Sequence, residues 1–162
     1  MKKILLLILL FVSLGVSAKD YKLVMLEPIQ NETCVFSGFS FSISFEWSEY
    51  ENYGVTVIVK NESDSRIYIE WENARIEDEP ICFGTDNSFS YRNRKPDEVV
   101  HSGSQCKRFI ARQSQFKYEG RDLFHKKWAK ERGISEKVVI IIPVRSGEKV
   151  KDYRFTLAVK PK

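Results

Sequence analysis

FSFSISFEW, residues Phe39 to Trp47, places a large apolar residue at every odd position and a serine or glutamate at every even one. Side chains of a β-strand point to alternate faces, so this pattern gathers the aromatic bulk on one side. A helix would need apolar residues three and four apart, a spacing that this stretch lacks. The stretch predicts a strand of an antiparallel sheet, with one face packed on a partner layer and the other wet or lightly covered.

The same period of two returns in the next part of the chain. Apolar residues alternate in GVTVIVKN, residues 54–61, and again in RIYIEW, residues 66–71. The polar link NESDS, residues 61–65, separates the two runs, so they are predicted to form a hairpin. The apolar run YKLVML, residues 21–26, predicts a strand before all of these.

The C-terminal part of the sequence predicts a second hairpin. KVVIIIPVR, residues 137–145, is an apolar strand, Ser146-Gly147 is a turn signal, and apolar residues alternate over 153–159. Pro143 has no N–H to donate to a neighbouring strand, so its strand is expected at a sheet edge or at a bulge. At least six strands are predicted in total.

One segment has the spacing of a helix. RDLFHKKWAKER, Arg121 to Arg132, carries Asp122 as a capping residue, has Phe124 and Trp128 four apart, and is followed by Gly133. Residues 77–105 are polar and contain prolines and glycines, so a long connection is expected there.

These elements together predict an all-β fold. Short antiparallel strands with one short helix in a connection are typical of a single two-layer sandwich of the immunoglobulin-like type. A closed barrel remains the alternative architecture.

The N-terminus has the order of a secretory signal peptide over residues 1–18. Two lysines precede an apolar run and then Val16-Ser17-Ala18, so cleavage is expected between Ala18 and Lys19. A retained membrane anchor is the alternative, but the run from Ile4 to Val16 has 13 residues, and a spanning helix needs roughly 17 to 25. The protein is therefore expected to be exported, periplasmic or extracellular, without a transmembrane anchor after cleavage.

Cleavage would leave one β-sandwich domain, residues 19–162, with a small net charge. Its 144 residues are enough for one domain with a sizeable core. Loss of Lys2 and Lys3 lowers the formal charge from +4 to +2. Nucleic-acid binders usually concentrate basic charge on one face, so a nucleic-acid partner is not expected.

Three cysteines, Cys34, Cys82 and Cys106, follow the predicted cleavage site. In an oxidising compartment two of them would tend to pair and leave one thiol over. The pair Cys82–Cys106 is favoured, because both flank the most irregular part of the chain, where a crosslink would restrict the unfolded ensemble. Three buried thiols are the alternative, since free cysteine behaves as a small apolar residue.

Motifs for catalysis and for metals or cofactors are scarce. The sequence contains no P-loop, no G-x-S-x-G, no H-E-x-x-H and no EF-hand loop. His101 lies five residues before Cys106 and close to Ser104, and these three residues define the alternative of a small envelope hydrolase or thiol enzyme. Neither a catalytic residue nor a metal or cofactor site is predicted, because partners for these groups are missing.

A basic cluster in the expected helix is the one predicted interaction patch. Its members surround an aromatic residue: Lys126, Lys127, Trp128, Lys130 and Arg132. A cationic surface with an aromatic anchor fits an acidic envelope polymer or a lipid headgroup. The structural alternative is that Phe124 and Trp128 pack on the sandwich while the lysines face water.

The stretch NESDSRIYIEWENA resembles part of a group of exported bacterial immunoglobulin-like β-sandwich proteins of unknown function. In that group an asparagine-led turn precedes an I-x-I-x-W strand and an acidic residue, here Asn61, Ile67, Ile69, Trp71 and Glu72. Further similar positions occur at His101, Gly103, Pro143, Tyr153 and Phe155. The resemblance covers about residues 40–160 and implies a fold and an envelope setting, but no activity. Members are often lipid-anchored, whereas this chain lacks the anchoring cysteine.

Three functional hypotheses follow. The first is a non-enzymatic exported β-sandwich that acts as a binding or accessory structural module, with an envelope protein or an acidic envelope polymer as partner. The second is the envelope hydrolase or thiol enzyme that would use His101. The third is a carrier whose aromatic interior encloses a small apolar ligand.

Overall fold

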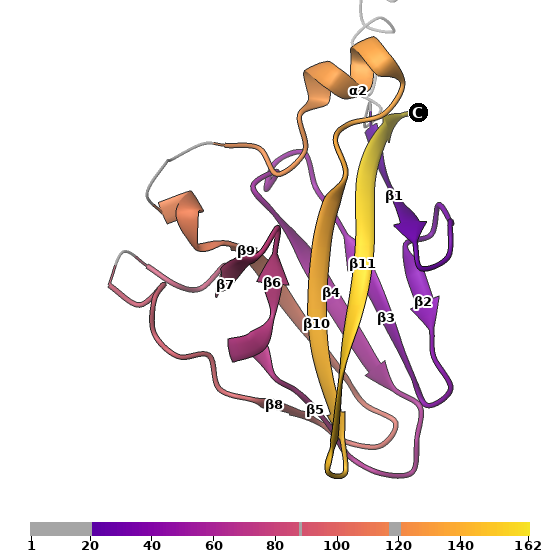
Figure 1. Cartoon of the computed structure of the whole chain (residues 1–162), viewed down its shortest axis with the longest axis vertical. Helices are drawn as coiled ribbons and strands as arrows, with labels where there is room; N and C mark the ends of the chain where they lie inside the picture. Colours follow the sequence, from indigo (N-terminus) through magenta and orange to yellow (C-terminus); the bar gives the residue numbers. More distant parts are fainter. Residues whose placement is uncertain (1–20, 88, 117–120) are drawn as a thin grey trace, which may run out of the picture.

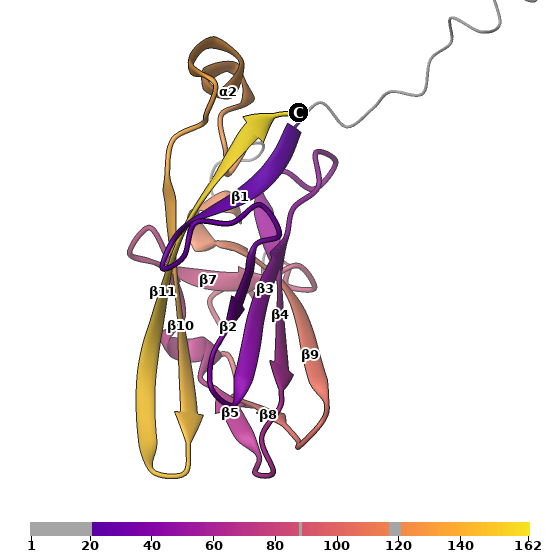
Figure 2. The ribbon, with the colours of Figure 1, turned by 90° about the vertical axis from the view of Figure 1, so that its right-hand side faces the viewer.

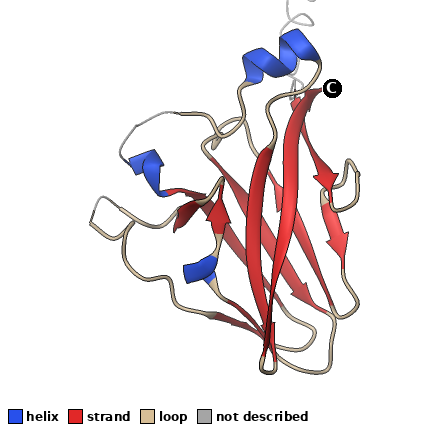
Figure 3. Ribbon diagram, in the orientation of Figure 1, coloured by secondary structure: helices blue, strands red, loops and turns tan. Residues whose placement is uncertain are grey.

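The computed structural model describes residues 21–87, 89–116 and 121–162, and this part of the chain is mostly antiparallel β-structure (Figures 1 and 3). It holds eleven strands, two 3₁₀ turns and a single α-helix. The prediction of an antiparallel all-β fold with one short helix in a connection is confirmed. The predicted signal peptide, with its cleavage site at Ala18 and Lys19, lies outside the described residues.

The elements have the following bounds in chain order. They are β1 (Tyr21–Glu27), β2 (Val35–Ser37), β3 (Phe41–Glu46), β4 (Gly54–Asn61), β5 (Ile67–Ile69), η1 (Trp71–Asn73), β6 (Arg75–Ile76), β7 (Glu79–Phe83), β8 (Glu98–Val100), β9 (Gln105–Arg112), η2 (Gln113–Phe116), α2 (Lys126–Arg132), β10 (Val138–Ser146) and β11 (Lys149–Pro161).

The strands form one connected, strongly curved sheet. Hydrogen-bonded neighbours follow the order β1-β11-β10-β6-β7-β9-β4-β3-β2, and β5 pairs with β10 and β8. Figure 2 shows β10 and β11 on one side and β3, β4 and β9 on the other, with β7 between them. The ends of the path approach each other, because an isolated bridge joins Met25 of β1 to Asn31 in the loop before β2. The sheet is thus nearly barrel-shaped rather than clearly divided into two layers.

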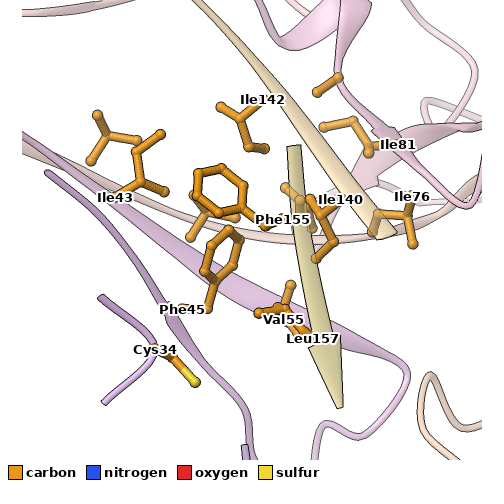
Figure 4. Packing of buried hydrophobic residues seen from close by; sticks show 14 of the residues in the cluster. Cys34, Ile43, Phe45, Val55, Ile76, Ile81, Ile140, Ile142, Phe155 and Leu157 are labelled. Carbon is orange, nitrogen blue, oxygen red and sulfur yellow. The ribbon is translucent and has the colours of Figure 1, made fainter. Parts of the chain in front are cut away.

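The core lies inside this curved sheet (Figure 4). Phe41, Ile43 and Phe45 of β3 are buried, as the alternation predicts. The Phe45 ring packs edge-on against Phe155 of β11, with 4.9 Å between ring centroids. Each large apolar side chain buried in this way stabilises the fold by roughly 1.5–3 kcal/mol.

Phe39 departs from the alternation, because the strand begins two residues later. Its side chain is fully exposed, at 109% of the reference area. The Gly38 N–H donates to the Phe41 carbonyl at 2.8 Å, which closes a turn between β2 and β3 and places Phe39 at its tip. The prediction that Phe39 faces the core is therefore wrong.

One of the two predicted hairpins is confirmed. β10 and β11 pair along their length, from Val138 opposite Leu157 to Ser146 opposite Lys149. The other is wrong, because β4 pairs with β3 and β9, whereas β5 pairs with β10 and β8. The link 61–66 carries the chain from one side of the curved sheet to the other.

Pro143 lies in an interior strand and not at a sheet edge. β10 pairs with β11 on one side and with β5 and β6 on the other. The Pro143 carbonyl accepts from the Glu70 N–H at 3.1 Å, at the break between β5 and β6 where η1 begins. Since the nitrogen and the carbonyl of one strand residue face the same side, the missing N–H falls where the neighbouring strand is interrupted.

The helix is shorter than the sequence predicts. α2 begins at Lys126, with His125 in the capping position, so the expected cap at Asp122 is not formed. The Leu123 N–H donates to the Asn52 carbonyl at 2.7 Å, and this bond holds the preceding segment against the loop after β3. The expected end is confirmed, because Gly133 adopts φ +75°. The expected connection 77–105 also contains two strands, β7 and β8.

Candidate functional site

The predicted interaction patch lies on α2, at one end of the molecule (Figure 1). The segment is anchored by three buried residues, Leu123, Phe124 and Ala129. Phe124 packs edge-on against Trp47, with 6.0 Å between centroids. Lys127, Trp128, Lys130 and Arg132 of the helix are exposed to solvent, whereas Lys126 is half-buried.

Trp128 is the centre of this patch. Its side chain is 40% exposed, whereas the side chain of Phe124 is fully buried. The Arg132 guanidinium lies over the indole, 4.8 Å from its centroid, and the His125 ring lies 5.3 Å away on the other flank. Position i+4 of a helix shares the face of position i, which brings Arg132 to Trp128, whereas His125 lies in the capping position just before the helix begins.

The charge of the patch is mainly unneutralised. Lys127 and Glu131 are one turn apart, with 3.9 Å between Nζ and Oε1, and both are exposed. An exposed pair of this kind contributes little. Among the described residues Lys126, Lys130 and Arg132 form no ion pair. The structure therefore brings all five predicted patch residues to one exposed, cationic helix.

His125 is a member of the patch that the prediction omitted. Its backbone N–H donates to the Glu136 carboxylate at 2.9 Å, and its ring flanks Trp128. The spacing of three residues between His125 and Trp128 was the available signal, since residues so spaced are neighbours on a helix. Here the helix begins only after His125. The position of the His125 ring beside Trp128 therefore depends on the residue at which α2 begins.

The residues of the enzyme alternative are not arranged as a catalytic pair. The Ser104 hydroxyl donates to the backbone carbonyl of His101 at 2.7 Å and not to its imidazole. Cys106 is buried, and burial is the main cause that raises the pKa of its thiol to about 11, with the nearby Glu98 carboxylate adding to the shift. A nucleophilic thiol needs the opposite shift.

The predicted Cys82–Cys106 disulfide is not formed, and all three cysteines are buried free thiols. Cys82 of β7 lies opposite Ala111 of β9, five residues along that strand from Cys106. At about 3.3 Å per residue, this offset is roughly 16 Å, whereas bonded cysteines have Cα atoms less than about 7 Å apart. The sequence does not show this offset, because the long segment between the two cysteines hides the fact that β7 and β9 pair directly.

The acidic residues between 70 and 79 bind separate partners. Glu70 pairs with Arg145 at 2.9 Å, Glu72 accepts from the Lys95 backbone N–H at 2.7 Å, and Glu79 accepts from the Ser114 N–H at 3.3 Å. The carboxylates therefore point in different directions. Among the described residues no group of three or more histidines, cysteines or carboxylates is placed to hold a metal ion.

No helix in the described parts of the chain has the length and apolar character needed to cross a membrane. Comparisons with models of protein families, with curated proteins and with solved structures find no match to this chain.

Proposed function

We propose that this chain is an exported, non-enzymatic β-domain that binds an acidic polymer of the bacterial envelope through the α2 patch. The observation that carries the proposal is the exposed Trp128 held between Arg132 and His125 on a helix with four cationic side chains. Cations attract anionic groups of the polymer, and the indole supplies a rigid apolar contact.

The build of the patch supports binding more than a structural role. A helix that served only to cover the sheet would bury its largest side chain, but α2 buries Ala129 and leaves Trp128 exposed. Lys127 is also exposed, with 82% of its side-chain area accessible. An immobile aromatic residue loses little conformational entropy on binding, so it contributes well to a shallow contact surface.

The finer fold assignment and the exported setting belong to the same proposal. We take the curved sheet as an immunoglobulin-like sandwich with strongly bent edges, of the kind found in the exported bacterial proteins that the sequence resembles. The resembling residues Asn61, Ile67, Ile69 and Trp71 are all buried, which fits a shared structural framework. Export follows from the charged, apolar and small-residue order of residues 1–18.

Titration with alginate, a polyuronate, and with inorganic polyphosphate tests the proposal. The chain from residue 19 should bind at least one of them, with an affinity that falls as salt rises, because salt screens exposed charges. The variant Lys127→Gln/Trp128→Ala/Lys130→Gln should lose roughly tenfold or more in affinity, since each surface cation contributes on the order of 1 kcal/mol.

The matched control removes the same charge at the opposite end of the molecule. Lys149→Gln/Lys151→Gln lies in the β10–β11 hairpin, far from α2 (Figure 1), and should bind as the unchanged protein does. Equal loss in both variants would show unspecific attraction and contradict the proposal. Absence of binding to both polymers at low salt, or retention of an envelope protein in place of them, would also overturn it.

A further inference from the structure

A groove on the outer face of the sheet shares no lining residue with the α2 patch. It has a volume of about 530 Å³, within the range of ligand sites. Its walls come from β3, β4 and β9 and from the loop that follows β3. Glu46, Thr56 and Phe109 form its floor, because they stand directly opposite one another in three neighbouring strands. Residues opposite each other in antiparallel strands share a face.

The aromatic ring of Phe109 is held in a fixed position on this outer face. A Cβ atom at Gly54 would lie 2.6 Å from Phe109 Cζ, and one at Gly84 would lie 2.8 Å from its Cδ1. The ring therefore fills the space of two absent side chains. Tyr53 packs edge-on against it, with 5.1 Å between centroids. A large apolar ring outside the core, locked by two glycines, is preorganised for stacking on a ligand.

The polar groups around Phe109 can both donate and accept hydrogen bonds. Lys107 Nζ and Glu46 Oε2 form an exposed ion pair at 2.7 Å across the groove, above the intervening strand β4. Thr56 lies between Glu46 and Phe109 in the sheet, and Glu51 belongs to the loop that follows β3. Saccharide hydroxyls also donate and accept, so they can bond to a carboxylate and an ammonium together.

The charge balance selects among ligand classes. Two carboxylates, Glu46 and Glu51, face one ammonium, that of Lys107, so an anionic ligand is repelled. A wholly apolar ligand would strip water from the ion pair without replacing its hydrogen bonds. A neutral sugar is not repelled by the carboxylates, and its hydroxyls can replace the water that the ion pair loses. It also has an apolar C–H face that can stack on an aromatic ring.

We infer that this groove binds a neutral saccharide chain, with one sugar ring on Phe109 and its hydroxyls bonded to Glu46 and Lys107. The site differs from the α2 patch in ligand charge and in the residues that form it. It therefore does not depend on the proposed function, and either one can fail alone.

The test is titration calorimetry of the chain from residue 19 with neutral hexasaccharides of glucose and of N-acetylglucosamine in β-1,4 linkage, and of glucose in α-1,4 linkage. At least one should bind with a dissociation constant below about 1 mM, the weak end of specific binding. Phe109→Ala should weaken it at least about tenfold, as loss of an aromatic anchor does. Glu46→Gln, which leaves the ring in place, should weaken it by a smaller factor.

Phe89→Ala is the matched control, because Phe89 is equally aromatic, 91% exposed and outside the groove. This variant should bind as the unchanged protein does. Circular dichroism shows whether Phe109→Ala is folded. If it is not folded, the saccharide affinities of Glu46→Gln and Thr56→Val test the inference in its place. The inference is overturned if no hexasaccharide binds at 5 mM, about fivefold above the weak limit, if the groove variants bind normally, or if a polyuronate displaces the sugar from the groove.

Discussion

At the scale of single residues, Asn61 is the most consequential polar group in the molecule. Its side chain is fully buried, and its amide donates to the Ser65 carbonyl at 2.7 Å and to the Val100 carbonyl at 2.9 Å. Its side-chain oxygen accepts from the Ser63 N–H and hydroxyl, at 3.0 and 2.8 Å. The residue thus ties the end of β4 to the crossing link and to β8, and all its hydrogen-bonding capacity is used.

Asn61→Ala should lower the free energy of unfolding by about 3 kcal/mol, because it leaves buried backbone groups without partners. Urea denaturation followed by circular dichroism measures this change. The control is Asn93→Ala at an exposed turn position, which should change stability by less than about 0.5 kcal/mol. Equal midpoints for the two variants would show that the Asn61 bonds do not hold the link.

The sequence predicted the place of such residues better than their function. Asn61 was expected at the head of a turn, and it is there, but a single sequence does not show that its amide reaches Val100, 39 residues later. Lys95 and Asp86 form a buried ion pair at 2.6 Å within a segment expected to be a polar connection. Contacts between residues far apart in the chain leave no periodic pattern in the sequence around either residue, so they cannot be predicted from one sequence.

At the scale of elements, the turn between β6 and β7 is the corner that joins the two sides of the curved sheet. Its two residues, Glu77 and Asp78, have φ of +52° and +65°. Two-residue hairpin turns with both φ positive favour asparagine and glycine, and a side chain there costs energy. Glu77 has a compensating contact, because its carboxylate accepts from the Val139 N–H of β10.

Asp78→Gly should stabilise the protein by about 0.5–1 kcal/mol, because glycine adopts positive φ without a steric penalty. Thermal unfolding measures the shift in midpoint. Glu77→Gly at the neighbouring position should gain less or should destabilise, because it removes the carboxylate that accepts from Val139. A larger gain at Glu77 than at Asp78 would contradict this account of the turn.

This turn also explains why the hairpin β6–β7 was missed. Strand periods and asparagine-glycine turns predict hairpins well, and the β10–β11 hairpin with its Ser146-Gly147 turn was confirmed. Glu77-Asp78 has neither turn residue, and β6 has two residues, too few for an alternating pattern. The architecture of the corner was therefore hidden in a segment that read as a loop.

At the scale of the whole molecule, three buried thiols couple stability to alkaline pH. Burial raises the pKa of Cys34, Cys82 and Cys106 to about 11 from an ordinary value of 9.0. Because the thiol pKa is higher in the folded protein than in the unfolded chain, the protonated thiols contribute their full stability to the fold below pH 9.0. It is lost as pH rises through the folded-state value near 11, because the unfolded chain releases protons first.

The free energy of unfolding should therefore fall between pH 8 and pH 10.5, by on the order of 1 kcal/mol for each thiol. Urea denaturation at both values measures the fall, and Cys106→Ala should show a smaller one. The lysines titrate in the same way in the unchanged protein and in Cys106→Ala, so their contribution cancels when the two falls are compared. An equal fall in both, or one reactive thiol per chain in urea without reductant, would contradict three buried free thiols.

The candidate site was predictable in composition but not in exposure. The five predicted patch residues are neighbours on one short helix, so their closeness could be predicted from the sequence. Whether Trp128 or Phe124 enters the core depends on where the helix begins, and that is set by contacts with the distant residues Asn52 and Trp47. The outer groove assembles three strands in register, so no single stretch carries its signature.

The pairing of β1 with β11 has a consequence for biosynthesis. Glu27 and Thr156, joined by a side-chain hydrogen bond, are 129 residues apart. At about 5–20 residues per second, roughly ten seconds pass between the synthesis of β1 and the synthesis of β11, its neighbour in the sheet. Throughout that interval β1 lacks its partner strand, so this edge of the sheet can form only after β11 has emerged.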